Sequence, residues 1–189
     1  FYLPAICTST IVGTVFSKIF ETNRGYLNVI LRALHLDFLC QQWLATPKTA
    51  LACLLFVNIW QWTGYSMLMY YTNMLNIPQD LYESATIDGA GSFKQFIYIT
   101  FPLLRGTHIT LIILDILGAL KFFDLSYVLT DGGPAHATET FSTYIYTKSF
   151  STFQQGQAST IVVFMFLIAM VLTVIQLKIY YKKDRKEMN

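Results

Sequence analysis

Long apolar stretches alternate with shorter polar segments along this chain of 189 residues. Four of them stand out, at residues 1–20, 50–74, 104–127 and 157–180. A helix rises about 1.5 Å per residue, so about 20 residues cross a hydrocarbon core about 30 Å thick. Because lipid offers no partners for backbone groups, a crossing segment must bond them within its own helix. We therefore predict an all-α, polytopic membrane bundle that crosses the bilayer four times.

The composition agrees with a membrane protein and argues against other classes. Hydrophobic residues make up 54% of the chain and charged residues 13%, against about 25% charged residues in soluble domains. The net charge of +2 and the lack of a basic stripe argue against a nucleic-acid partner. The three cysteines and three histidines lack metal-ligand spacing. We expect one transmembrane domain over residues 1–189, surrounded by lipid, with no metal, cofactor or catalytic residue.

The distribution of basic residues predicts the orientation of the chain. Five of them crowd the C-terminal end, namely Lys178, Lys182, Lys183, Arg185 and Lys186. The positive-inside rule places this end in the cytoplasm, and alternation then places residues 76–102 inside. The segment 131–140, "DGGPAHATET", would be a turn on the outside, with Thr138 and Glu139 starting the next helix. The first loop, outside by the same count, is also basic, with Arg24, Arg32 and Lys48.

A short polar segment, residues 76–102, interrupts the apolar pattern between the second and third stretches. Asp88 followed by Gly89 suits the end of a helix. Ser92 and Gln95 have the spacing of a capping box, which predicts a second short helix. A helix of about nine residues is about 14 Å long and cannot span the bilayer. We expect two short helices at the membrane surface, either as an ordinary interfacial loop or as a docking site for another protein.

The spacing within this segment resembles a known family motif. The residues that carry it are Glu83-Ser84-Ala85, Gly89, Ile99 and Phe101-Pro102. They resemble the EAA motif of permease subunits in binding-protein-dependent ABC importers, with Ser84 in place of an alanine and Phe101 in place of a leucine. The stretch "LTDGGPAHATETFSTYIYTKSF" resembles, more narrowly, the carbohydrate branch, which includes maltose, glycerol-phosphate and multiple-sugar permeases. The resemblance covers essentially the whole chain.

This resemblance implies a role and a set of partners. The chain would be the permease of an ATP-driven sugar importer in the cell membrane, with a second homologous permease beside it. Cytoplasmic ATPase subunits would hydrolyse ATP, and an extracytoplasmic solute-binding protein would deliver the sugar. The segment 76–102 would hold the coupling helix, with ATPase-coupling residues Glu83, Ser84, Ala85, Asp88, Gly89 and Ala90. Such permeases usually have six spans, so we expect two N-terminal spans to be missing from this sequence.

Candidate sugar-path residues lie in the second and third apolar stretches. The sequence "NIWQWTGYSM" combines aromatic faces, which stack on sugar rings, with amides and hydroxyls, which bind sugar hydroxyl groups. An ionised Asp115 costs about 2.5–3.5 kcal/mol in a membrane helix, so we expect it to face a cavity or a partner. By resemblance to sugar permeases, the path comprises Gln61, Trp62, Tyr65, Asp115, Gly118, Ala119 and Phe122.

Other interpretations of these residues stay open. The aromatic residues also suit plain packing or interfacial belts, and Asp115 could pair with Lys121 within its own helix. An ion-coupled secondary transporter could use Asp115 as a proton or sodium site. A membrane-embedded enzyme could use it as a catalytic carboxylate, although no second catalytic group lies at an informative spacing. Co-purification of an ATPase separates the importer from both alternatives.

Overall fold

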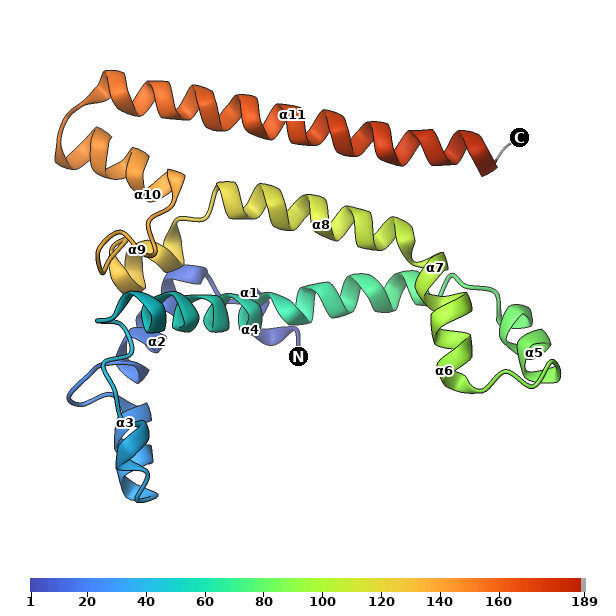
Figure 1. The fold of residues 1–189 in the computed structure, drawn as a ribbon, viewed down its shortest axis with the longest axis horizontal. Helices are drawn as coiled ribbons and strands as arrows, with labels where there is room; N and C mark the ends of the chain where they lie inside the picture. Colours follow the sequence, from blue (N-terminus) through green and yellow to red (C-terminus); the bar gives the residue numbers. More distant parts are fainter. Residues whose placement is uncertain (188–189) are drawn as a thin grey trace. The chain divides into compact units, whose positions relative to one another are not determined.

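The computed structural model describes residues 1–187, and all regular elements in this range are helical. This confirms the all-α prediction. The backbone contacts divide the chain into two units, which are described separately below. Three long helices contribute to both units, namely α4 (Pro47–Met74), α8 (Arg105–Leu120) and α11 (Gln155–Glu187) (Figure 1).

Unit 1 comprises Phe1–Gly64 and Gly118–Ala169. Besides its parts of the long helices, it contains α1 (Leu3–Ile6), α2 (Ser9–Ile19), α3 (Tyr26–Ala33), η1 (Asp37–Leu39), α9 (Asp124–Thr130), α10 (Phe141–Tyr146) and η3 (Thr147–Ser151). Buried apolar side chains from α2, α4 and α9 and the residue after α2 form its core, namely Val12, Phe20, Cys53, Val57, Leu125 and Leu129. The core therefore joins helices that lie far apart in the sequence.

Glycine allows α2 and α9 to approach closely in unit 1. A Cβ atom added at Gly13 would lie 3.1 Å from Cγ1 of Val128 and 3.4 Å from Cδ2 of Leu125. In a membrane protein, van der Waals packing drives helix association, and small residues permit it. Gly13 is therefore a packing residue of this contact.

Unit 2 comprises Tyr65–Leu117 and Met170–Asn189. Between α4 and α8 it contains α5 (Gln79–Ile87), α6 (Ser92–Gln95), η2 (Phe96–Thr100) and α7 (Phe101–Leu103). The π-helical turn η2 continues α6 without a break into α7. Figure 1 shows α5 folded back beside α6, so the two form a helical hairpin. The predicted pair of short helices within residues 76–102 is confirmed.

Two of the four apolar stretches are less regular than the sequence suggests. Residues 1–20 form α1 and α2 instead of one helix. Thr8 between them is extended, and its hydroxyl accepts a hydrogen bond from the Ile11 amide at 3.4 Å, which caps α2. Within residues 104–127, α8 and α9 are likewise separate helices.

By length and composition, Gln155–Lys178 of α11 is a candidate membrane span, with a mean hydropathy of 2.7. The bent pair Ser92–Leu103 and Arg105–Leu120, whose halves meet at 62°, is a second candidate if it counts as one span. Crossing by residues 1–20 and 50–74 stays a prediction. The basic side chains used for orientation beyond Lys178 lie outside the described part of the chain.

Candidate functional site

The helix α5 ends in a tight glycine turn. The amide of Ala90 donates to the Ala85 carbonyl at 2.9 Å, and the amide of Gly89 donates to the Thr86 carbonyl at 3.0 Å. This pair of bonds is the Schellman arrangement, which needs a left-handed residue directly after the C-cap. Gly89 supplies it with φ 74°, a conformation that side chains with a Cβ rarely adopt. The predicted stop at Asp88 and Gly89 is therefore confirmed.

Side-chain bonds fix the hairpin that follows. Tyr82 Oη of α5 lies 2.8 Å from Oγ1 of Thr100, which is buried at the end of η2. The Gln95 amide nitrogen donates to Thr86 Oγ1 at 2.9 Å and to the Ala90 carbonyl at 3.0 Å. The predicted capping box is wrong: α6 has Gly91 at its N-cap with no side-chain cap, and Gln95 bonds back to the Ala90 carbonyl instead.

The outer surface of this hairpin carries acidic and apolar side chains. We call residues 80–94 the elbow. Its exposed charged groups are three carboxylates, Asp80, Glu83 and Asp88, and one cation, Lys94. Ser84 and Gly89 are exposed as well, while Ala85 and Ala90 are half-buried. On either side of the glycine turn, Ile87 is 87% exposed and Phe93 is 75% exposed. Large apolar groups at such a tip, next to carboxylates, suit a partner with a basic rim and an apolar groove.

A histidine links the hairpin to α4 and α8, two of the long helices. The ring of His108 on α8 lies 2.8 Å through Nδ1 from Tyr70 Oη on α4, and 3.2 Å through Nε2 from the Phe101 carbonyl on α7. A carbonyl only accepts, so Nε2 carries the proton and Nδ1 accepts from the tyrosine hydroxyl. This role of His108 has no signal in the sequence, because His108 stands alone without a motif.

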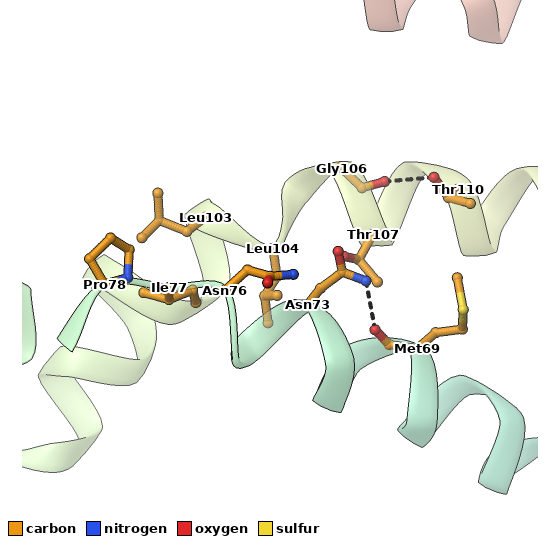
Figure 2. Close-up of a pocket in the computed structure, with 10 residues that line it drawn as sticks. All are labelled: Met69, Asn73, Asn76, Ile77, Pro78, Leu103, Leu104, Gly106, Thr107 and Thr110. Atoms are coloured by element: carbon orange, nitrogen blue, oxygen red, sulfur yellow. Dashed lines mark hydrogen bonds between the residues drawn. The ribbon is translucent and has the colours of Figure 1, made fainter.

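A pocket with a volume of about 450 Å³ lies where the hairpin joins these helices (Figure 2). It is lined by the end of α4, the linker to α5, the bend between α7 and α8, and the first turns of α8. The lining residues are Met69, Asn73, Asn76, Ile77, Pro78, Leu103, Leu104, Gly106, Thr107 and Thr110. Two of its polar side chains bond within their own helices, Asn73 to the Met69 carbonyl at 2.8 Å and Thr110 to the Gly106 carbonyl at 3.0 Å. The pocket therefore leaves room beside the 62° bend.

The predicted sugar-path residues in unit 1 have different environments. Gln61 is fully buried, and its amide nitrogen donates to the Cys7 carbonyl at 3.0 Å. Its Oε1 is buried without a partner among the described residues. Phe122 follows the end of α8 and packs against the core of unit 1. Trp62, Gly118 and Ala119 are exposed.

Two predicted path residues belong to unit 2. Asp115 lies on α8 and is exposed, and Tyr65 lies on α4 and is half-buried. Within unit 2, the described residues provide no ion-pair partner for Asp115. Lys121 and Asp124 lie in unit 1, near the end of the third apolar stretch, and they form no ion pair with each other.

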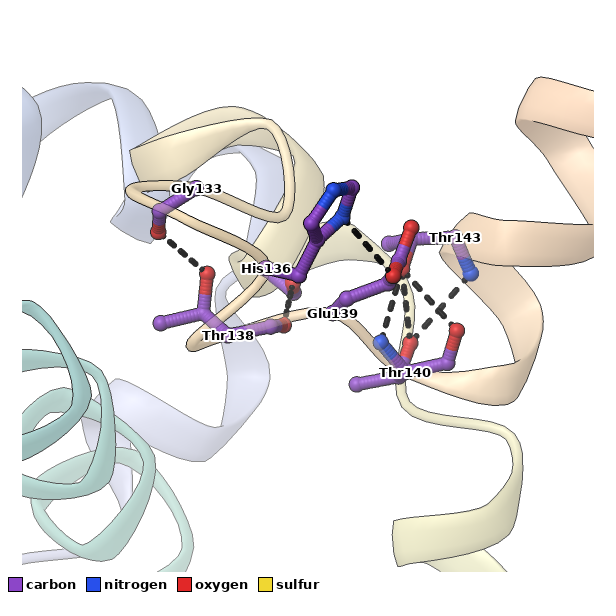
Figure 3. Close-up of polar contacts among 7 residues, drawn as sticks. Gly133, His136, Thr138, Glu139, Thr140 and Thr143 are labelled. Atoms are coloured by element: carbon purple, nitrogen blue, oxygen red, sulfur yellow. Dashed lines mark hydrogen bonds and ion pairs between the residues drawn. The ribbon is translucent and has the colours of Figure 1, made fainter. Parts of the chain in front are cut away.

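The loop before α10 is held by threonines (Figure 3). Thr138 is buried, its hydroxyl donates to the Gly133 carbonyl at 2.7 Å, and its own carbonyl accepts a hydrogen bond from Ser126 Oγ. The turn prediction is confirmed, but α10 begins at Phe141, after Thr138 and Glu139. Thr140 forms the capping box with Thr143, because Thr138 is used inside the loop. His136 stays outside, 82% exposed, with Nδ1 3.0 Å from Glu139 Oε2.

The chain is similar in sequence to proteins of known class. The family described as "Binding-protein-dependent transport system inner membrane component" matches residues 2–185. The probable ABC transporter permease protein YurN of Bacillus subtilis is 35% identical over 99% of this chain and 64% of the relative. The trehalose/maltose transport system permease protein MalF of Thermococcus litoralis is 33% identical over 94% of this chain and 59% of the relative.

Two solved structures share the fold. One is a bacterial ABC transporter that imports the acidic polysaccharide alginate, with a TM-score of 0.86 at 24% identity over 96% of this chain and 63% of that chain. The other is a bacterial alginate ABC transporter in complex with a pentasaccharide-bound periplasmic protein, with a TM-score of 0.83 at 25% identity over 93% of this chain and 60% of that chain. The chain thus spans less than two thirds of the length of these proteins. It belongs to the family of inner membrane components of binding-protein-dependent transport systems.

Proposed function

We propose that this chain is a permease subunit of an ATP-driven sugar importer and that the elbow docks onto a cytoplasmic ATPase. Its family membership and its similarity to a permease named for trehalose and maltose transport support this proposal. A second homologous permease and an extracytoplasmic solute-binding protein would complete the assembly. The similar alginate transporter was solved with a periplasmic protein, which supports the last partner.

One observation carries the docking proposal: the hairpin carries an exposed apolar tip and three exposed carboxylates, and hydrogen bonds within the hairpin hold it in shape. Ile87 and Phe93 make the tip, and most of their surface is exposed. The bonds from Tyr82 to Thr100 and from Gln95 to Thr86 fix the hairpin behind the tip. A preorganised apolar anchor binds with a smaller ordering cost than a flexible loop. Glu83 and Asp88 would meet basic groups at the rim of the groove.

The test removes the anchor without disturbing the fold. In cells that express the whole importer, Ile87→Ser and Phe93→Ser should each lower the amount of ATPase that co-purifies with the permease by about 10-fold or more, because truncating a hot-spot anchor costs about 2 kcal/mol or more. Phe153→Ser is the matched control, since Phe153 is 78% exposed in unit 1 and lies outside the elbow.

Wild-type ATPase recovery with both elbow variants would contradict the docking proposal. If no ATPase co-purifies with the wild-type complex and sugar uptake instead follows an ion gradient, the ion-coupled alternative that uses Asp115 is favoured. If uptake is also absent, the transport proposal itself is wrong.

The sugar path remains a proposal that rests on resemblance. On unit 1, Trp62, Gly118 and Ala119 are exposed and would face the ligand, whereas Gln61 and Phe122 pack inside and would support the wall from behind. On unit 2, Asp115 and Tyr65 would contribute a carboxylate and a phenol. The carboxylate would accept hydrogen bonds from sugar hydroxyl groups.

A further inference from the structure

The short helix α3 in unit 1 carries exposed apolar side chains on its outer face. Tyr26, Val29 and Ile30 share this face by spacing of three and four residues, and all three are exposed. The opposite face carries Leu27, which packs against the core of unit 1, and Asn28, which is buried. A surface helix of a soluble protein turns its apolar face to the core and its polar face to water. Here the outer face is apolar as well.

Hydrogen bonds from Asn28 hold α3 in this orientation. Its amide nitrogen donates to the Thr22 carbonyl and to the Gln41 carbonyl, both at 3.0 Å. Its Oδ1 accepts from the indole nitrogen of Trp43 at 2.8 Å. Three bonds to a buried amide are costly to break. The outward apolar face is therefore a built feature of this segment.

Further exposed apolar side chains follow α3 in the sequence. Leu34, Phe38 and Leu39 are exposed, and Phe38 is 80% exposed in η1. We call the side chains of Tyr26, Val29, Ile30, Leu34, Phe38 and Leu39 the α3 patch. All six lie within residues 26–39, which sets them apart from the scattered single apolar residues that any protein exposes.

Two arginines flank the patch. Arg24 precedes α3, and Arg32 lies in its last turn, at the edge of the apolar face by helical position. Both are exposed, and neither forms an ion pair among the described residues. Side chains of this type extend toward lipid phosphates from the edge of an interfacial helix. This arrangement also accounts for basic residues in a loop that the positive-inside rule would leave without them.

We propose that the α3 patch lies on the lipid bilayer, parallel to its surface, with Arg24 and Arg32 on anionic lipid headgroups. Eight residues of α3 extend about 12 Å, too short to cross but suited to lie in the interface. The assignment of the patch to the extracytoplasmic leaflet depends on the proposed topology. The proposed contact with lipid does not depend on that topology.

Photocrosslinking tests the occupant of the patch. The whole importer carries p-benzoylphenylalanine at position 30 or at position 38 and is reconstituted in nanodiscs of zwitterionic and anionic lipid. After irradiation, intact-mass measurement should detect a lipid adduct at both positions, with or without the solute-binding protein. The same amino acid at the exposed position of His136 is the control and should give at least 5-fold less lipid adduct.

The outcomes separate the possible occupants. A protein adduct at position 30 that appears only with the solute-binding protein would overturn the proposal in favour of a docking site for that protein. An adduct to a permease segment without the binding protein would overturn it in favour of a helix interface, and no adduct would show a water-facing patch.

A second measurement tests the arginines. The double variant Arg24→Gln/Arg32→Gln should keep the lipid adduct but lower its ratio of anionic to zwitterionic lipid by about two-fold. An unchanged ratio would refute the headgroup contact. Failure of the proposed transport function would instead appear as loss of the ATPase from the purified complex, which these adducts do not measure.

Discussion

At the scale of single residues, the elbow depends on one backbone conformation. Gly89 has φ 74°, and a Cβ atom added there meets nothing within 4 Å, so only the dihedral angle penalises a side chain. Gly91, two residues on, has φ −70° and open space as well. The two glycines thus separate backbone strain from steric contact.

We predict that Gly89→Ala loosens the elbow and that Gly91→Ala does not. The left-handed conformation costs a residue with a Cβ about 1–2 kcal/mol, so the amide of Ala90, which bonds the Ala85 carbonyl, should exchange with deuterium about 10-fold faster. Hydrogen exchange followed by mass spectrometry measures this. Equal exchange in the two variants would show that the glycine turn does not limit the stability of the elbow.

Sequence reasoning succeeded at residues whose role is set by their neighbours in the chain. Asp88 and Gly89 were assigned to the helix end because a C-terminal stop is a local signal. The capping box predicted for Ser92 and Gln95 is wrong, because Gln95 bonds Thr86 and Ala90 across the hairpin. Phe122 packs on a core built from α2, α4 and α9. Such contacts depend on tertiary packing, which spacing alone does not report.

At the scale of elements, His108 is the residue that ties α4, α7 and α8 together. Its ring lies 4.6 Å, centroid to centroid, from Phe101 and 5.2 Å from Tyr70, in addition to the two hydrogen bonds. All three residues border the place where the hairpin meets the long helices. Movement of the elbow would reach α4 and α8 through this contact.

We predict that His108→Leu lowers the thermal unfolding midpoint of the purified complex and that Tyr70→Phe lowers it by about half as much. The histidine variant loses two hydrogen bonds and the tyrosine variant loses one, each contributing about 0.5–1.5 kcal/mol. Thr110→Val is the control, because the Thr110 hydroxyl bonds only Gly106 within its own helix. A His108→Leu complex as stable as the control would exclude this bracing role.

Helix positions followed from the sequence better than helix ends. The two helices of the hairpin were expected because glycine and charge interrupt an apolar pattern. The sequence does not predict the break between α1 and α2, because Thr8 lies among apolar residues that are typical of the middle of a membrane span. The start of α10 moved to Phe141 because Thr138 is consumed by the loop. At both of these helix ends, a threonine hydroxyl bonds the backbone and shifts the start of the next helix.

At the scale of the whole molecule, the orientation in the membrane is the prediction with the widest consequences. The elbow should lie in the cytoplasm and the loop at residues 131–140 on the other side. Ile87 and His136 report on the two locations, since each side chain is more than four-fifths exposed. Neither takes part in a core.

We predict opposite labelling of Ile87→Cys and His136→Cys by a membrane-impermeant maleimide. In intact cells, or spheroplasts where an outer membrane blocks access, only the His136→Cys chain should be labelled above the parent chain, which carries Cys7, Cys40 and Cys53. In inside-out vesicles, only the Ile87→Cys chain should be labelled above the parent chain. Labelling of Ile87→Cys from outside would invalidate both the topology and the docking of the elbow onto a cytoplasmic ATPase.

The bonds that shape the elbow all close within residues 82–100, from Tyr82 with Thr100 to Ala90 with Ala85. The long helices that carry the elbow can therefore tilt without breaking any of these hydrogen bonds. The hairpin is thus suited to act as a rigid lever, which passes on a displacement at its tip without storing the work as internal deformation.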